Sequence, residues 1–157
     1  MKVLGIDPGT GRLGWAIVEK NKGQEELLGA GCLETRSNSP LPRRLLKIYE
    51  FLNKLIKKYK PDQAAVEELF FATNAKTAMS VSAACGVILL ACASHKIPVT
   101  NYSPVKIKSA IAGYGKADKS QIEYMICQIL ELKEAPKPDD AADAVAVALT
   151  HINCVKF

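Results

Sequence analysis

The chain has 157 residues, 48% of them hydrophobic and 24% charged, which fits one ordinary folded domain and excludes a disordered chain. The formal net charge of +5 is compatible with a polyanionic partner such as nucleic acid but does not require one. We expect a cytoplasmic protein without membrane contact, because the N-terminal apolar run is too short for a secretion signal and no run approaches the ~18 residues of a membrane span.

The first part of the chain predicts three strands joined by short turns. Residues 2–7 form an apolar run that stops at Asp7-Pro8-Gly9, and residues 13–19 form a second strand. A third strand is expected over roughly 25–34, after a hairpin turn. Three consecutive strands with short connections form an antiparallel meander.

The rest of the chain alternates helices with short strands. Ser39-Pro40 predicts a helix start, with Ser39 as the N-cap, and an apolar stripe continues to Tyr59. Asp118 and Gln121 have the spacing of a capping box at the start of a later helix. The other expected elements are strands at 63–67 and 97–102 and helices at 74–94 and 139–152. The order predicts an α/β fold in a single domain, residues 1–157, with a mixed five-stranded sheet and helices on both faces.

Acidic side chains occur inside segments that are otherwise apolar. They end two strands and occupy the first turn of the last helix: Asp7, Glu67, Glu68, Asp139, Asp140 and Asp143. Asp140 and Asp143 are three residues apart and share one helix face. These segments contain no Arg or Lys to pair with, and an unpaired carboxylate in apolar surroundings is costly. A shared divalent cation would remove that cost; Mg²⁺ prefers oxygen ligands, and two such ions ~4 Å apart support phosphodiester hydrolysis.

Each acid also has a purely structural interpretation. Acids near a helix N-terminus cap free N–H groups and suit the helix dipole, which is the favoured interpretation for Asp139. Asp7 before Pro8-Gly9 fits a turn residue. Periodicity cannot choose between Glu67 and Glu68, since a shift of one residue changes the face of the strand.

Four segments carry more specific motifs: Gly5-Ile6-Asp7-Pro8-Gly9-Thr10, Val66-Glu67-Glu68-Leu69-Phe70, Ala112-Gly113-Tyr114-Gly115 followed by Asp118-Lys119-Ser120-Gln121, and Asp140-Ala141-Ala142-Asp143-Ala144. In this order they resemble the motifs of the RuvC family, the crossover junction (Holliday junction) endodeoxyribonucleases. The resemblance extends from residue 2 to about residue 152, which is nearly the whole chain.

The resemblance implies a ribonuclease H-like fold, a homodimer, and Mg²⁺-dependent resolution of four-way DNA junctions by paired symmetric nicks in recombination and repair. Its catalytic and metal-binding acids map to Asp7, Glu67, Asp140 and Asp143, with two Mg²⁺ per site and Mn²⁺ as an alternative metal. This selects Glu67 over Glu68. The resemblance also implies the RuvA–RuvB branch-migration complex as a partner.

The resemblance further implies DNA-contacting residues. Lys108 and Lys119 align with lysines that are important in the family, and Lys106 and Lys116 lie close to them in a basic, glycine-bounded segment. Phe70 would stack on an unpaired base at the junction centre. Without the resemblance, each Lys would be a solvated surface charge and Phe70 a core residue.

Three other functions are compatible with parts of the sequence. An actin-like or sugar-kinase ATPase also begins with a strand and an Asp-x-Gly-Thr turn, but it needs two such domains and this chain is too short. A noncatalytic junction-binding module would use the acids only structurally. A ribonuclease H acting on RNA–DNA hybrids would share the fold and the metal chemistry and differ only in its substrate.

Overall fold

The computed structural model describes residues 1–68 and 75–155 and contains one five-stranded sheet with strand order β3-β2-β1-β4-β5. The strands are β1 (Lys2–Asp7), β2 (Arg12–Asn21), β3 (Gln24–Glu34), β4 (Gln63–Glu67) and β5 (Val99–Tyr102). The first three form the predicted antiparallel meander, β4 pairs in parallel with β1, and β5 pairs in parallel with β4. The predicted mixed sheet is therefore confirmed.

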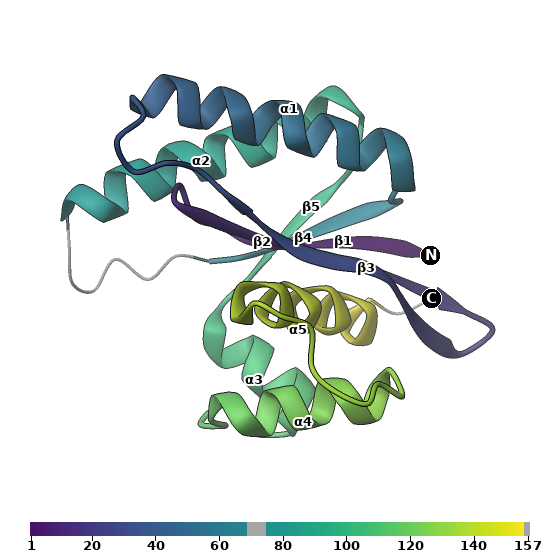
Figure 1. The fold of residues 1–157 in the computed structure, drawn as a ribbon. Helices are drawn as coiled ribbons and strands as arrows, with labels where there is room; N and C mark the ends of the chain where they lie inside the picture. The colour runs from purple at the N-terminus through teal and green to yellow at the C-terminus, as the bar shows by residue number, and fades with distance from the viewer. Residues whose placement is uncertain (69–74, 156–157) are drawn as a thin grey trace.

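Helices cover both faces of this sheet. They are α1 (Leu41–Tyr59), α2 (Ala75–Ser94), α3 (Pro104–Ala112), α4 (Lys119–Ile129) and α5 (Asp139–Cys154). In Figure 1, α1 and α2 lie on one face, and α5 lies against the other face with α3 and α4 outside it. Alternating residues of β1 separate the two cores: Leu4 and Ile6 pack toward α1 and α2, whereas Val3 packs toward α5.

Helix α3 was not predicted. Ser103 caps it, accepting a hydrogen bond from the backbone N–H of Lys106, and Pro104 follows in the first turn. Its two buried residues, Ile107 and Ile111, are four apart, so the apolar stripe is one turn long and too short to stand out as a period.

Two predicted helix starts have different outcomes. The Asp118–Gln121 capping box is present, with both of its reciprocal hydrogen bonds. The prediction of Ser39 as an N-cap was wrong, because α1 begins at Leu41 with Pro40 in the cap position and without a side-chain cap bond. Pro42, rather than Pro40, occupies the first turn.

Helix α5 lies unusually close to the centre of the sheet. A Cβ added at Gly5 would be 2.2 Å from the carbonyl oxygen of Ala144, and one at Gly14 would be 2.0 Å from that of Asp140. Glycine at both positions therefore permits the contact. Gly14 on β2 pairs with Asp7 at the end of β1. The contact at Gly14 therefore fixes the first turn of α5 next to the end of β1.

The expectation that no apolar run reaches the length of a membrane span was wrong for α2. Its residues 77–94 have a mean hydropathy of 1.8 and are, by length and composition alone, sufficient to cross a membrane. One side of α2 packs on the sheet through Ala84, Ile88, Ala91 and Cys92. Only 22% of the window is buried, and the large apolar side chains of Met79, Leu89 and Leu90 are exposed.

Candidate active site

The predicted acids meet at one edge of the sheet. Asp7 is the last residue of β1 and Glu67 the last of β4, and these strands are parallel neighbours whose register pairs Ile6 with Val66. The carboxyl ends of parallel strands lie at the same edge. The first turn of α5 then brings Asp140 and Asp143 to that edge through the close contact at Gly14.

Asp7 has the most strongly perturbed carboxyl group in the cluster. Burial, together with the nearby charges of Glu67, Asp143 and Asp140, raises the pKa of Asp7 to about 8, against a smaller opposing effect of Lys119. A like charge disfavours ionisation in the same way as desolvation does. All four predicted acids are therefore close enough to influence one proton.

Two other acids of the cluster are perturbed in the same direction. Burial raises the pKa of Glu67, and Asp143 adds to this effect, while Lys108 and a hydrogen bond with Asp7 oppose it. Burial also raises the pKa of Asp143, with Lys119 as the main opposing influence. Several acids pushed above their ordinary pKa in one place are typical of a functional site.

Cationic partners for two of the acids come from outside the acidic segments. Arg12, at the start of β2, places Nη2 2.9 Å from Oδ2 of Asp140. Lys119, at the start of α4, places Nζ 3.4 Å from Oδ2 of Asp143 and 3.1 Å from Oδ2 of Asp139. The expectation that these acids lack a basic partner holds within their own segments, but folding supplies partners that are distant in sequence.

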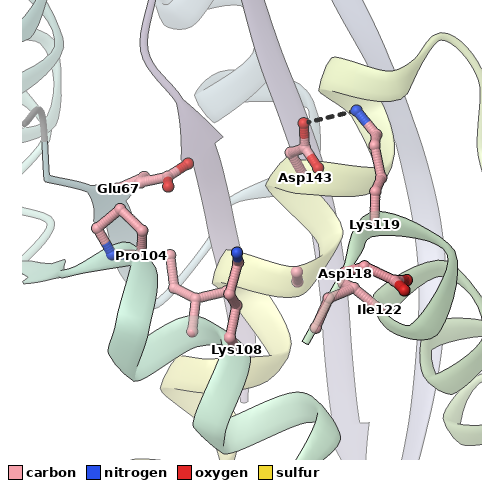
Figure 2. Close-up of a pocket in the computed structure, with 9 residues that line it drawn as sticks. Glu67, Pro104, Lys108, Asp118, Lys119, Ile122 and Asp143 are labelled. Atoms are coloured by element: carbon pink, nitrogen blue, oxygen red, sulfur yellow. Dashed lines mark hydrogen bonds and ion pairs between the residues drawn. The ribbon is translucent and has the colours of Figure 1, made fainter. Parts of the chain in front are cut away.

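A cavity of about 250 Å³ opens beside Glu67 and Asp143 and is also lined by Lys108 and Lys119, two of the four lysines predicted to contact DNA. Figure 2 shows Glu67 and Lys108 on one side of it and Asp143, bonded to Lys119, on the other. Acids and lysines thus face one small space. This arrangement suits a phosphate that must be held close to metal-binding carboxylates.

The remaining predicted site residues have different positions. Lys106 and Lys116 are exposed and do not line this cavity. Phe70, the predicted base-stacking residue, lies outside the described residues. Glu68, the alternative to Glu67, is exposed and lines a separate cavity of about 440 Å³ beside α2.

The donor set fits Mg²⁺ or Mn²⁺ rather than zinc. Asp7, Glu67, Asp140 and Asp143 offer only carboxylate oxygens, the ligands that hard divalent cations prefer. Among the described residues, no three His, Cys, Asp or Glu side chains are gathered tightly enough to enclose an ion as they stand. Arg12 and Lys119 engage two of the acids, so those carboxylates would have to turn toward a cation.

Sequence reasoning did not identify Arg12. It lies two residues before Gly14 on β2, so both residues face the same side of the sheet, toward α5. The two-residue spacing between Arg12 and Gly14 is therefore a signal present in the sequence. It could be interpreted only once the close approach of α5 to Gly14 was known.

Comparisons with known proteins cover nearly the whole chain. Residues 3–151 match the family described as "Crossover junction endodeoxyribonuclease RuvC". A relative of that name from Chloroflexus aurantiacus is 51% identical over 151 residues, 96% of this chain and 92% of the relative. One from Finegoldia magna is 49% identical over 157 residues, 100% of this chain and 96% of the relative. The solved structure of T. thermophilus RuvC in complex with Holliday junction substrate has 38% identity and a TM-score of 0.92, covering 97% of this chain and 93% of that one.

Proposed function

The chain belongs to the RuvC family of crossover junction endodeoxyribonucleases, and from this premise we propose that Asp7, Glu67, Asp140 and Asp143 are its catalytic acids. It is a Holliday junction resolvase with a ribonuclease H-like fold, a structure-specific endonuclease of DNA recombination and repair. One observation carries the assignment of the acids. The charges of Glu67, Asp140 and Asp143 all act on the pKa of Asp7, as expected for carboxylates that share a cation.

The family is metal-dependent, and we infer Mg²⁺ for this chain, with two ions per site. The four acids would hold these ions, and Mn²⁺ is the alternative metal because it accepts the same oxygen donors. Bound in such a site, the ions would supply a nucleophilic water at neutral pH and would stabilise the departing oxygen of the phosphodiester.

The chain's own residues bind and orient the scissile strand. Lys108 from α3 and Lys119 from α4 line the cavity next to Glu67 and Asp143. Their ammonium groups can bind the nonbridging oxygens of a phosphate and so fix it against the acids. Lys119 also contacts Asp143 and Asp139, which positions the first turn of α5.

Further DNA contacts are proposed for Lys106, Lys116 and Phe70. Lys106 is exposed in the first turn of α3, and Lys116 is exposed in the loop before α4. Both can contact phosphates next to the cleaved one. Phe70 follows the second acidic motif, and its ring would stack on an unpaired base. Phe70→Ala should then weaken cleavage without affecting folding, whereas normal cleavage would remove this role.

A homodimer formed through the outer side of α2 fits a four-way junction. Met79, Leu89 and Leu90 are large, exposed apolar residues of this helix. Several large exposed apolar side chains on one helix are typical of a protein interface. A two-fold dimer would place one active site on each of two symmetry-related strands of the junction. On the resemblance alone, the partner is the RuvA–RuvB complex and the compartment is the cytoplasm, with residues 1–157 acting as one domain.

Neutral substitutions at single acids test the proposed site, because the sequence provides an adjacent control. Asp7→Asn, Glu67→Gln, Asp140→Asn and Asp143→Asn should each lower single-turnover junction cleavage by ~100-fold or more and leave junction binding intact. Glu68→Gln, at the exposed acid next to Glu67, should change cleavage by no more than a few-fold. A site residue whose neutral variant cuts at the wild-type rate is not a catalytic acid.

A further inference from the structure

Arginine is distributed very unevenly in this chain. All four arginines lie between residues 12 and 44, and every other basic residue except the two histidines is a lysine. Arg36, Arg43 and Arg44 lie between the end of β3 and the first turn of α1, and we call these three residues the arginine surface. Residues 35–49 contain these arginines and Lys47 but no acidic residue.

Hydrogen bonds connect the arginine surface to the loop that follows the catalytic Asp7. Thr35 donates its backbone N–H to the carbonyl of Gly11 at 2.9 Å and its hydroxyl to the carbonyl of Thr10. Arg44 donates Nε–H to the hydroxyl of Thr35 at 2.8 Å. The arginine surface is therefore held in a fixed position relative to the end of β1.

The arginine surface and the cavity lysines lie on opposite faces of the sheet. Helix α1 covers one face, whereas α3 and α4, which carry Lys108 and Lys119, lie on the other (Figure 1). The acids lie between them, at the edge where β1 and β4 end. DNA whose cleaved strand contacts the lysines can therefore continue past the acids toward α1.

The guanidinium groups are available for a ligand. Arg36 and Arg43 are exposed, and neither they nor Arg44 form an ion pair with any acidic side chain in the described part of the chain. Arg12, by contrast, is committed to Asp140. Arginine presents a planar fork of donors that matches the two oxygens of a phosphate.

We propose that the arginine surface is a second DNA-binding surface, which contacts the phosphate backbone of the junction arm on the α1 side of the acids. The inference rests on the proposed function, because it assumes that the junction is the substrate. A four-way junction has arms that diverge from the crossover, so a protein that binds the crossover needs contacts on both sides of its catalytic acids. The recognised feature is the backbone, and the contact carries no sequence preference.

The salt dependence of binding tests this inference. We would measure the Kd of a four-way junction in EDTA, which prevents cleavage, over a series of salt concentrations. Each lost phosphate contact lowers the slope of log K against log salt by about 0.9. The double variant Arg36→Gln/Arg43→Gln should lower the slope by about 1–2 and weaken binding about tenfold at moderate salt.

A matched control removes the same charge from the other end of α1. Lys54→Gln/Lys57→Gln replaces two exposed cations near the C-terminal end of α1. This variant should leave the slope of log K against log salt unchanged. Arg36→Lys/Arg43→Lys should restore most of the slope, because charge rather than geometry dominates the release of counterions. Arg44 is left unchanged, since its bond to Thr35 supports the fold.

The outcomes separate the inference from the function on which it rests. If the wild type binds and cuts the junction while the arginine and control variants have the same slope as the wild type, the second surface does not exist and the resolvase stands. The same holds if both double variants lower the slope equally, because the effect is then net charge. If the wild type neither binds nor cuts the junction, the proposed function itself is wrong.

Discussion

Asp7 connects the electrostatics of the site to the stability of the whole fold. The unfolded chain releases this proton near the ordinary pKa of 3.8, whereas the folded chain holds it to about pH 8. Between these values the folded state binds more protons than the unfolded state, so stability falls as pH rises. The ionised cluster is therefore unfavourable unless a cation compensates for it.

The first prediction concerns Asp7→Asn. In EDTA, the melting temperature of the wild type should fall between pH 5 and pH 8, with a change in unfolding free energy on the order of a few kcal/mol. The Asn variant, which has no proton to lose at this position, should lose most of this dependence and be more stable than the wild type at pH 8. Mg²⁺ should stabilise the wild type most at high pH.

Thermal denaturation monitored by circular dichroism at several pH values gives this comparison. Glu68→Gln is the control, because Glu68 is exposed and adjacent to the site. An Asn variant that melts with the same pH dependence as the wild type would show that Asp7 does not carry the raised pKa.

At the residue scale, the sequence predicts which acids could meet at one edge of the sheet but not which basic residues pair with them. Asp7 and the pair Glu67–Glu68 stand out because a carboxylate at the end of an apolar strand needs compensation, and the resemblance to the RuvC family selects Glu67. The pairing of Arg12 with Asp140 depends on how closely β2 approaches α5, which no local pattern encodes. Residue types identify a candidate site, but its electrostatic balance requires the fold.

At the scale of elements, the position of α5 determines the site. Two of the four acids reach the edge of the sheet only because this helix packs directly on β1 and β2. Periodicity predicted the helix and its apolar character. It could not predict the close approach, since glycine inside a strand has several structural explanations.

The second prediction tests the close packing of α5 on the sheet with two alanine substitutions. Gly14→Ala would place a Cβ 2.0 Å from the carbonyl oxygen of Asp140, which is backbone and cannot move aside. It should destabilise the fold by about 3 kcal/mol or more and impair cleavage. Gly11→Ala, whose Cβ would lie 3.5 Å from the guanidinium of Arg44, should change stability by less than about 1 kcal/mol.

Urea denaturation of both variants gives the measurement. Equal stabilities for Gly14→Ala and Gly11→Ala would contradict the close seating of α5. The failure to predict α3 has a related cause, because a helix of nine residues with two buried side chains carries too little periodic signal.

At the scale of the whole molecule, α2 leaves large apolar side chains uncovered. Met79 is 76% exposed and Leu90 is 60% exposed, although the helix is apolar along its length. The sequence predicts a helix at 74–94, but it gives no information about how many faces of that helix are covered. In the proposed homodimer, the second copy covers the outer face.

The third prediction is that Leu90→Glu converts the dimer to a monomer. A charge in the centre of an apolar interface lacks a partner and should weaken association by ~100-fold or more. Leu46→Glu is the matched control, because Leu46 is 55% exposed on α1 and lies outside the proposed interface. Multi-angle light scattering should give half the wild-type mass for the first variant only, and equal masses for all three proteins would remove α2 from the interface.

We propose that this chain cuts four-way junctions with the acids at the edge of the sheet. The most direct measurement is a denaturing-gel cleavage assay on an end-labelled junction with a mobile core and on a linear duplex of the same sequence, each with Mg²⁺ and with EDTA. We predict symmetric, Mg²⁺-dependent nicks confined to the junction, and their loss in Asp7→Asn with junction binding retained. Binding of the junction without cleavage by the wild type, or cleavage that persists in Asp7→Asn, would contradict the account.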